Sequence, residues 1–144
     1  MRIVVIDGQG GGIGYQVILA LRGGLPDEVE IIALGTNAVA TQNMMRAKAN
    51  KGATGENAIV RTVSKADIII GTLSILAANS MLGELTPAMA EAIGSSDAIK
   101  LLLPHNQSQI EVVTVVSKPL PHAIEDLVKR VQEIYIEREG NGNV

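Results

Sequence analysis

The hydrophobic pattern of the chain opens with an apolar run that leads directly into a cluster of glycines. Residues 3–6 are four consecutive β-branched side chains, which predict a buried strand over residues 2–7. Five of the next seven residues are glycine, and apolar residues then recur at helical spacing from Ile13 to Leu21. This spacing predicts a helix that Gly23 and Gly24 end. The chain therefore begins with a strand, a tight turn and a helix.

Apolar runs and helical spacing continue to alternate along the rest of the chain. Short apolar runs predict strands at residues 30–34, 67–71, 100–103 and 110–116, and helices are expected at 37–48, 86–94 and 120–137. We expect Asn37 to cap the first of these helices, and Thr86 followed by Pro87 to open the second. Strands that alternate with helices predict a doubly wound, mainly parallel sheet in a three-layer, Rossmann-like α/β/α domain. This single domain is expected over residues 1–138, with a flexible tail at 139–144.

Two segments allow more than one assignment. Residues 49–57 are either a loop before a strand at 58–63, or a short strand at 49–53 with Thr54 capping a helix from Gly55 to about Lys65. Ile59 and Val63 recur at helical spacing, so we take the second assignment, which places residues 52–57 on the same rim as the glycine turn. Residues 76–85 read as a short helix or an ordered loop.

Composition narrows the classes of protein that fit. The chain has 144 residues, 47% hydrophobic residues, no Phe or Trp, and a formal net charge of -3, which argues against nucleic-acid binding. It has no cysteine, which excludes disulfides and thiolate chemistry, and its two isolated histidines make a metal site improbable. No apolar stretch reaches membrane-spanning length, and the first strand leaves no room for a signal peptide, so we expect a cytoplasmic protein without membrane contact.

The glycine turn carries the strongest chemical signal. Glycine lets backbone N–H groups approach a phosphate closely, and the following helix points its free N–H groups at the same place. The spacing G-x-x-x-G-x-G fits Gly8, Gly12 and Gly14, and the turn lacks the lysine of a Walker-A motif. With the ends of neighbouring strands added, we expect a nucleotide, with NAD or NADP as the cofactor, at Gly8, Gln9, Gly10, Gly11, Gly12, Ile13, Gly14, Thr36, Asn37, Gly71 and Thr72.

The end of the second predicted strand bears on the choice between these cofactors. In NAD-binding folds an acidic residue at this place holds the adenosine ribose. Here Thr36 and Asn37 stand instead, which leaves NADP or another nucleotide open. Arg46 and Lys48 could serve a 2′-phosphate, although solvated charges are the more ordinary interpretation.

Other polar side chains are expected at the same edge of the sheet. We expect Asp7 to hydrogen-bond across its own turn, and His105 is the histidine placed to act as an acid or a base. Asn79, Ser80 and Glu84 could face a ligand or a second subunit. Ser74, Asn106 and Ser108 complete the polar groups expected there.

Two resemblances follow from these motifs. The turn Gly8-x-x-x-Gly12-x-Gly14 resembles the cofactor turn of short-chain dehydrogenases/reductases, and residues 52–57 resemble the third-strand end of atypical members. The Tyr-x-x-x-Lys pair of that family is missing, because Tyr15 is followed by Leu19 and Tyr135 by Glu139. Four segments, 5–14, 33–38, 52–58 and 78–84, resemble a family of small bacterial proteins described as a domain of unknown function, which implies a Rossmann-like fold and no activity.

Three functions remain open from the sequence. The first is a binding module that holds a nucleotide or dinucleotide at residues 8–14 as a sensor, carrier or accessory subunit. The second is an NAD(P)-dependent oxidoreductase whose site a second subunit completes, so a homo-oligomer is plausible. The third is a structural or assembly protein whose glycine turn binds no ligand. A turn closed by side chains, with no cavity above the strand ends, would favour the third.

Overall fold

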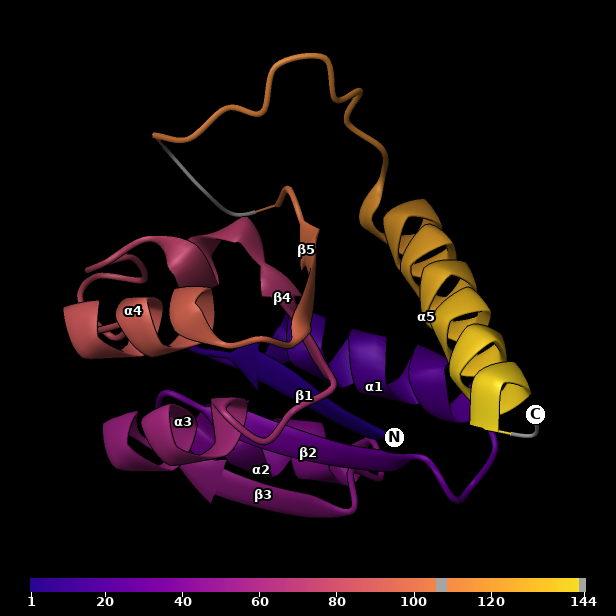
Figure 1. The fold of residues 1–144 in the computed structure, drawn as a ribbon. Coiled ribbons are helices and arrows are strands. Elements are labelled where there is room, and N and C mark those ends of the chain that lie inside the picture. Colours follow the sequence, from indigo (N-terminus) through magenta and orange to yellow (C-terminus); the bar gives the residue numbers. More distant parts are fainter. Residues whose placement is uncertain (106–108, 143–144) are drawn as a thin grey trace.

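Strands and helices alternate along the chain and form a sheet between two layers of helices (Figure 1). The computed structural model describes residues 1–105 and 109–142. The elements are β1 (Arg2–Asp7), α1 (Gly12–Gly24), β2 (Glu30–Gly35), α2 (Ala38–Arg46), β3 (Lys51–Thr54), α3 (Glu56–Val63), β4 (Ile68–Thr72), the 3₁₀ helix η1 (Leu73–Leu76), α4 (Pro87–Ser95), β5 (Ile99–Leu103) and α5 (Leu120–Gly142).

Within residues 1–105 and 109–142 the sheet has five strands in the order β3-β2-β1-β4-β5, and every pair is parallel. The first strand is central, and the strand order reverses on either side of it. The glycine turn follows β1 and therefore lies at the switch point, where open α/β sheets hold their ligands. This topology confirms the predicted single Rossmann-like α/β domain.

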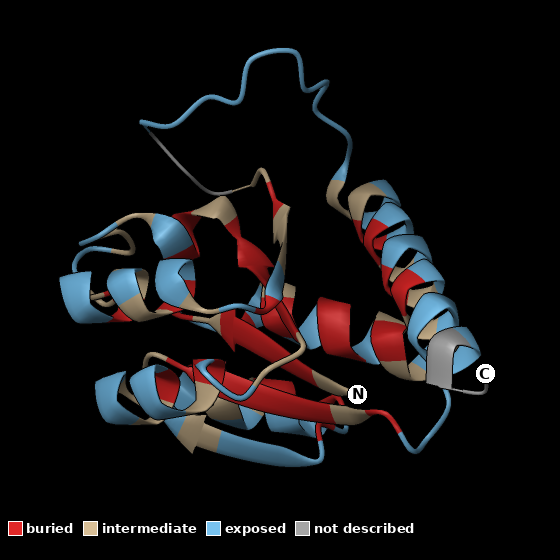
Figure 2. Ribbon diagram, viewed as in Figure 1, coloured by how far each residue is buried: buried red, intermediate tan, exposed pale blue. Residues whose placement is uncertain are grey.

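Alternate residues of each central strand face the two helical layers. Ile3 and Val5 of β1 pack with α1, α2 and α5, whereas Val4 and Ile6 pack with α3, η1 and α4. Figure 2 shows this core as the red interior of the sheet and the inward sides of the helices. Strands buried on both faces read as continuous apolar runs, which is why the strand predictions for β1, β2 and β4 were confirmed.

Helix starts follow the predicted capping chemistry at two places. The side chain of Asn37 accepts a hydrogen bond from the backbone N–H of Ala40 at 2.9 Å, and that of Thr86 accepts one from Met89 at 3.2 Å. At α3 the parallel pairing of β3 with β2 confirms the second assignment of residues 49–65. The cap, however, is Gly55 and not Thr54, and no side chain caps this helix.

The end of α1 differs from the prediction. Gly23 and Gly24 were expected to stop the helix after Leu21, but both are helical, and α1 ends at Gly24 with Leu25 as its C-cap. A Cβ on Gly24 would lie 2.8 Å from Val128, and the carbonyl of Gly24 accepts a hydrogen bond from Gln132 at 2.8 Å. Because Gly24 has no side chain, α1 and α5 can approach each other closely at this point.

The prediction of a sixth strand is wrong. Residues 110–116 form no strand, and every residue from 109 to 119 is exposed. Thr114 has a φ of 75°, and the N–H of Val115 donates to the carbonyl of Val112 at 3.3 Å, so the chain turns here. After this segment α5 continues to Gly142, beyond the expected end near Glu137 and into the segment expected to be a flexible tail. Residues 143–144 of that tail lie outside the described residues.

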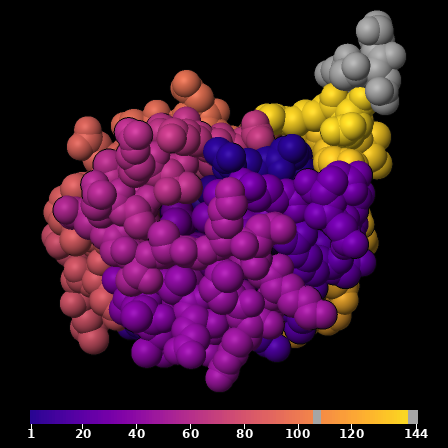
Figure 3. Space-filling view, turned by 90° about the horizontal axis from the view of Figure 1, so that it is seen from below, coloured from indigo at the N-terminus to yellow at the C-terminus, as the bar shows by residue number. Residues whose placement is uncertain are grey.

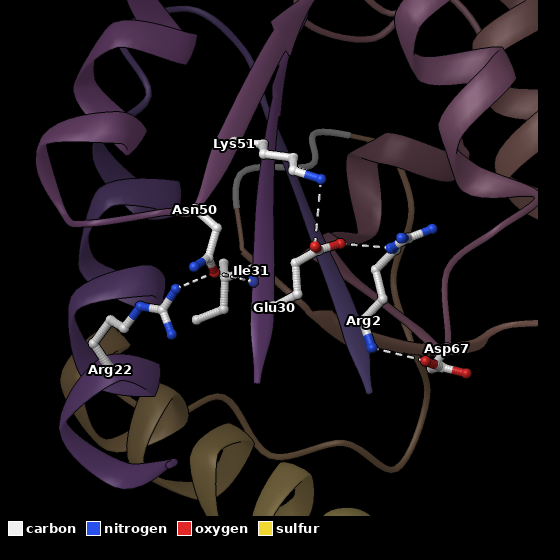
Figure 4. Close-up of polar contacts among 7 residues, drawn as sticks. All are labelled: Arg2, Arg22, Glu30, Ile31, Asn50, Lys51 and Asp67. Carbon is white, nitrogen blue, oxygen red and sulfur yellow. Dashed lines mark hydrogen bonds and ion pairs between the residues drawn. The ribbon is translucent and has the colours of Figure 1, made fainter. Parts of the chain in front are cut away.

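Charged side chains join the strands at their amino ends (Figure 4). The guanidinium of Arg2 contacts the carboxylate of Glu30 at 2.6 Å, and the ammonium of Lys51 contacts the same carboxylate at 3.5 Å. Asp67 accepts from the backbone N–H of Arg2 at 2.7 Å and from Arg138 of α5 at 2.9 Å. Three strands, the segment before β4 and the last helix are therefore linked at one end of the sheet.

A second group at the same end surrounds Asn50. Its side-chain oxygen accepts hydrogen bonds from the backbone N–H of Ile31, at 2.7 Å, and from the guanidinium of Arg22 (Figure 4). Arg22 also donates to the carbonyls of Val29 and Lys48 at 3.0 and 2.8 Å. In the view from below, purple and magenta atoms from the first half of the chain cover most of the face that is seen (Figure 3).

Candidate functional site

The glycine turn is held from beneath by Asp7, the last residue of β1. One oxygen of its carboxylate accepts the N–H of Gly8 and the other accepts the N–H of Gly14, both at 2.8 Å. These bonds confirm that Asp7 hydrogen-bonds across its own turn. Because both oxygens are engaged, Asp7 acts as a brace for the turn.

Different structural features favour glycine at different positions of the turn. Gly11 has a φ of 72°, and a Cβ on it would lie 2.8 Å from the backbone of Ala40. A Cβ on Gly8 would meet the sulfur of Met81, and one on Gly14 the sulfur of Met44, each at 2.5 Å. Packing or backbone conformation therefore requires these three glycines.

Neither packing nor backbone conformation requires a glycine at positions 10 and 12. A Cβ on either would have no atom within 4 Å, and neither has a positive φ. Among the described residues, no acceptor reaches the N–H groups of Gly10, Gly12 or Ile13. The outer side of the turn is therefore open backbone with free donors at the start of α1.

A carboxylate from a distant part of the chain lies on the inner side of the turn. One oxygen of Glu84 accepts the N–H of Gln9 at 2.9 Å, the hydroxyl of Thr36 at 2.7 Å and the side-chain amide of Asn37 at 2.8 Å. The amide of Asn37 also donates to the carbonyl of Gln9 at 2.9 Å. An acidic group thus lies at the end of β2, where the sequence showed only Thr36 and Asn37.

Glu84 is carried by residues 77–85, the loop between η1 and α4, which we call the 77–85 loop. Four of its residues have positive φ values: 67° at Asn79, and 57°, 56° and 91° at the three consecutive residues Met81, Leu82 and Gly83. Left-handed backbone is unfavourable for side chains as bulky as those of Met81 and Leu82. Leu82 is also 99% exposed. The loop therefore combines a strained backbone with an apolar side chain in water.

The 77–85 loop leaves a small cavity above the strand ends. Its volume is about 70 Å³, and it is lined by Asp7, Gly8, Gln9, Thr72, Ser74 and Met81. The hydroxyl of Thr72 is buried in this wall, with the residue 4% exposed, and has no hydrogen-bond partner among the described residues. This hydroxyl can therefore donate to a polar group that enters the cavity.

The two carboxyl groups at the turn have opposite pKa shifts. Burial raises the pKa of Asp7, hydrogen bonds from Gly14 and Gly8 oppose that rise, and the charge of Glu84 adds to it. The hydrogen bond from Thr36, followed by that from Gln9, lowers the pKa of Glu84. Glu84 is therefore ionised at neutral pH.

Most of the predicted site residues lie at the turn or around the small cavity, whereas His105 follows β5 at the same edge of the sheet and contacts a different segment. Its Nε2 lies 3.0 Å from the carbonyl oxygen of Lys118, far along the chain from the glycine turn, and it does not line the small cavity. Gly71 lies within β4, where a Cβ would be 3.0 Å from the carbonyl of Ile6 in β1, so it serves packing. Asn106 and Ser108 lie outside the described residues.

Glu84 is the site residue whose place the sequence did not give. It was grouped with Asn79 and Ser80 as facing either a ligand or a subunit. In the structure the hydroxyl of Ser80 donates to the carbonyl of Ser74 at 2.6 Å, so Ser80 closes the loop on itself, while Glu84 reaches the turn. In the sequence Glu84 is a lone acid in a segment of small polar residues, and this pattern does not predict which part of the protein its side chain contacts.

Two general features complete the description of this region. Within residues 1–105 and 109–142, no group of three or more His, Asp or Glu side chains could hold a metal ion. No helix in that part of the chain is long and apolar enough to cross a membrane.

Comparison with known proteins gives one match. No curated protein and no solved structure matches the chain. The family model described as Domain of unknown function (DUF3842) matches residues 2–136, nearly the whole sequence. The chain therefore belongs to the DUF3842 family of domains of unknown function.

Proposed function

We propose that this protein is a nucleotide-binding module that holds the phosphates of a nucleotide or dinucleotide against the outer side of the glycine turn. The observation that carries the proposal is the open backbone at Gly10, Gly12 and Ile13. Three free N–H groups lie beside two glycines that neither packing nor backbone conformation requires. Such N–H groups at a helix start suit an anion, and a side chain at Gly12 would occupy the space above them.

Two further groups support a phosphate ligand at this place. The side chain of Asn43 donates to the carbonyl of Gly10, and Arg46 donates to the side-chain oxygen of Asn43 at 3.1 Å. A guanidinium is thus attached to the turn through one residue. The hydroxyl of Thr72, buried without a partner, offers a polar contact to a ligand that enters the cavity.

Glu84 favours a ligand of the NAD type over one of the NADP type. Its carboxylate lies on Thr36 and Asn37 at the end of β2, the place from which an acid binds the adenosine ribose in NAD-binding folds. No donor among the described residues reaches its second oxygen, which could accept a ribose hydroxyl. A 2′-phosphate at the same place would meet a negative charge.

Binding would require the 77–85 loop to move. Ligand pockets measure about 300–1,000 Å³, several times the volume of the cavity beneath this loop. The left-handed Met81 and Leu82 make the closed loop strained, and movement would relieve that strain. We therefore propose that the loop acts as a lid, and that Glu84 holds it closed through the turn.

The residues that line the cavity do not favour acid–base catalysis. The titratable residue that lines the cavity is Asp7, and both of its oxygens accept backbone N–H groups. A binding role as a sensor or accessory module therefore fits better than catalysis within this chain.

One observation favours a second candidate function. The inner side of the turn is already filled by the carboxylate of Glu84 and the sulfur of Met81, and the cavity is small. In this alternative Glu84 is a permanent internal ligand, and the turn is a clasp in a structural or assembly protein. The two candidates differ in whether any nucleotide binds.

A thermal-shift panel separates them. NAD(H), NADP(H), FAD, S-adenosylmethionine, coenzyme A, ATP and GTP are each added, and the midpoint of unfolding is measured. A ligand at a hundredfold over its Kd adds about 2.7 kcal/mol to the free energy of unfolding, which raises the midpoint by about 5–10 °C for a chain of this length. We expect the largest rise with NAD(H).

Gly12→Val is the informative variant, because a Cβ added there has no atom of the protein within 4 Å. It should abolish the ligand-dependent rise while leaving the midpoint without ligand nearly unchanged. Gly23→Val is its matched control, since Gly23 is also in α1 and also has open space around it. No rise with any nucleotide would refute the proposal and leave the structural alternative.

A further inference from the structure

The segment between β5 and α5 projects from the body of the protein. Residues 109–119, which we call the arm, are all exposed and form the arch that stands away from the sheet in Figures 1 and 2. Val113 is 77% exposed and Val116 is 83% exposed. A group of apolar side chains exposed in this way marks a surface that contacts another molecule. The large apolar side chains exposed in the arm are Ile110, Val112, Val113, Val115 and Val116.

The base of the arm is tied, so that the arm is held out from the body. His105 lies before the arm and Lys118 within its last residues, and Nε2 of His105 is 3.0 Å from the carbonyl oxygen of Lys118. The ammonium of Lys118 in turn contacts the carboxylate of Asp126 on α5 at 2.5 Å. The turn at Thr114 bends the arm again near its middle. These contacts give a preformed projection and assign a structural role to His105.

An unpaired sheet edge lies beside the arm. Among the described residues β5 ends the strand order and pairs with β4 alone, and it is less buried than β4, with Ile99 37% exposed. An edge strand presents a row of free backbone donors and acceptors that can pair with another strand. The sequence Ile-Glu-Val-Val-Thr-Val-Val of the arm has the β-branched composition of a strand without being one here. The chain thus carries both an unpaired edge and an unpaired strand-forming segment.

A hollow of about 410 Å³ separates β5 from the arm and from the start of α5. Its apolar walls include Leu101, Leu103 and Leu127, and it is not filled by the arm of the same chain. Its charged lining residues are Lys100, Lys118, Asp126 and Arg130, of which Lys118 pairs with Asp126. Glu111 of the arm is opposite in charge to the remaining two groups, Lys100 and Arg130.

We propose that the arm is a dimerisation element, and that the arm of one copy lies along the β5 edge of a second copy and fills this hollow. Each copy supplies one arm and one edge, so a two-fold axis satisfies both contacts at once. In such a dimer Glu111 of each arm lies near the cations that line the hollow of the other copy. The inference does not depend on nucleotide binding.

Sedimentation over a concentration series from low micromolar to several hundred micromolar tests the dimer. The full chain should be dimeric at the upper end, and Val113→Glu should raise the dissociation constant at least about tenfold. Ile136→Glu is the matched control, because Ile136 is 68% exposed on α5 outside the arm and should leave the dimer unchanged. A monomer at every concentration, or equal effects of the two variants, would overturn the proposal.

Cross-linking tests where the arm lies, since the chain has no cysteine of its own. Ile99→Cys and Val113→Cys chains of different mass are mixed and treated with a short bismaleimide. A cross-linked pair that contains one chain of each kind is the expected product. Cross-links between two Val113→Cys chains alone would overturn the edge placement. A chain with both cysteines that cross-links within itself at monomer mass would show the arm folding onto its own edge, and would also overturn it.

Discussion

Glu84 provides a direct test of how the turn is held. In the Glu84→Ala variant the N–H of Gln9, the hydroxyl of Thr36 and the amide of Asn37 lose a shared charged acceptor. A hydrogen bond to a charged group contributes about 1.5–3 kcal/mol when it is well buried. Glu84 is only partly buried, so water replaces much of each bond, and we expect a total loss of about 1–2 kcal/mol in the free energy of unfolding. The midpoint of thermal unfolding should fall by about 3–6 °C.

The assay is equilibrium urea unfolding of the wild type and the variant at several pH values. The pKa of Glu84 in the folded protein lies below its ordinary value of 4.5. Its carboxylate therefore stabilises the fold fully above that ordinary value, and this contribution is lost as the pH falls through the depressed folded pKa. The difference between wild type and variant should be largest near neutral pH and should shrink in acid.

Glu91→Ala is the matched control, because Glu91 is an exposed acid on α4 whose side chain has no hydrogen bond among the described residues. It should change the free energy of unfolding by less than about 0.5 kcal/mol. If Glu84→Ala behaves like this control at neutral pH, or if its effect grows in acid, then Glu84 does not hold the turn in the manner described.

Three further predictions concern the framework of the site. Gly11→Ala should destabilise the fold by more than about 2 kcal/mol, since Gly11 has a φ of 72° and touches the backbone of α2; Gly10→Ala should stay within about 0.5 kcal/mol in the same urea titration. Asp7→Ala leaves two backbone N–H groups without acceptors and should lower the free energy of unfolding by about 2–3 kcal/mol, and a value near zero by denaturant unfolding would contradict its role as a brace. Thr86→Ala should lose about 1 kcal/mol in calorimetry, with Thr86→Ser retaining most of it, because the hydroxyl caps α4.

Local patterns were sufficient to predict the fold. The strand predictions near β1, β2 and β4 depend on residues that are buried on both faces, and the caps at Asn37 and Thr86 depend on neighbours three residues away. Such features are written in short stretches of sequence. The parallel order of the strands then follows from the helices that connect them.

The errors arose where the outcome depends on distant residues or on a partner. Residues 110–116 have strand composition, but a strand needs an edge to pair with, and composition does not supply one. Gly23 and Gly24 resembled a helix stop, although Gly24 is helical and packs against Val128 and Gln132 of α5, over a hundred residues later. Glu84 reaches the turn from 75 residues away. No local spacing encodes that contact.

The two ends of the sheet differ in how firmly they are fastened, and this has a consequence for local opening. At the amino ends, Arg2, Glu30, Lys51 and Asp67 link successive strands, and Arg138 brings in the last helix. At the carboxyl ends, the 77–85 loop reaches the turn mainly through one carboxylate. Backbone amides at the amino ends should therefore exchange with deuterium only on global unfolding, while those of the 77–85 loop should exchange through a separate, low-energy opening. The fold can open above the glycine turn without loosening the sheet that positions it.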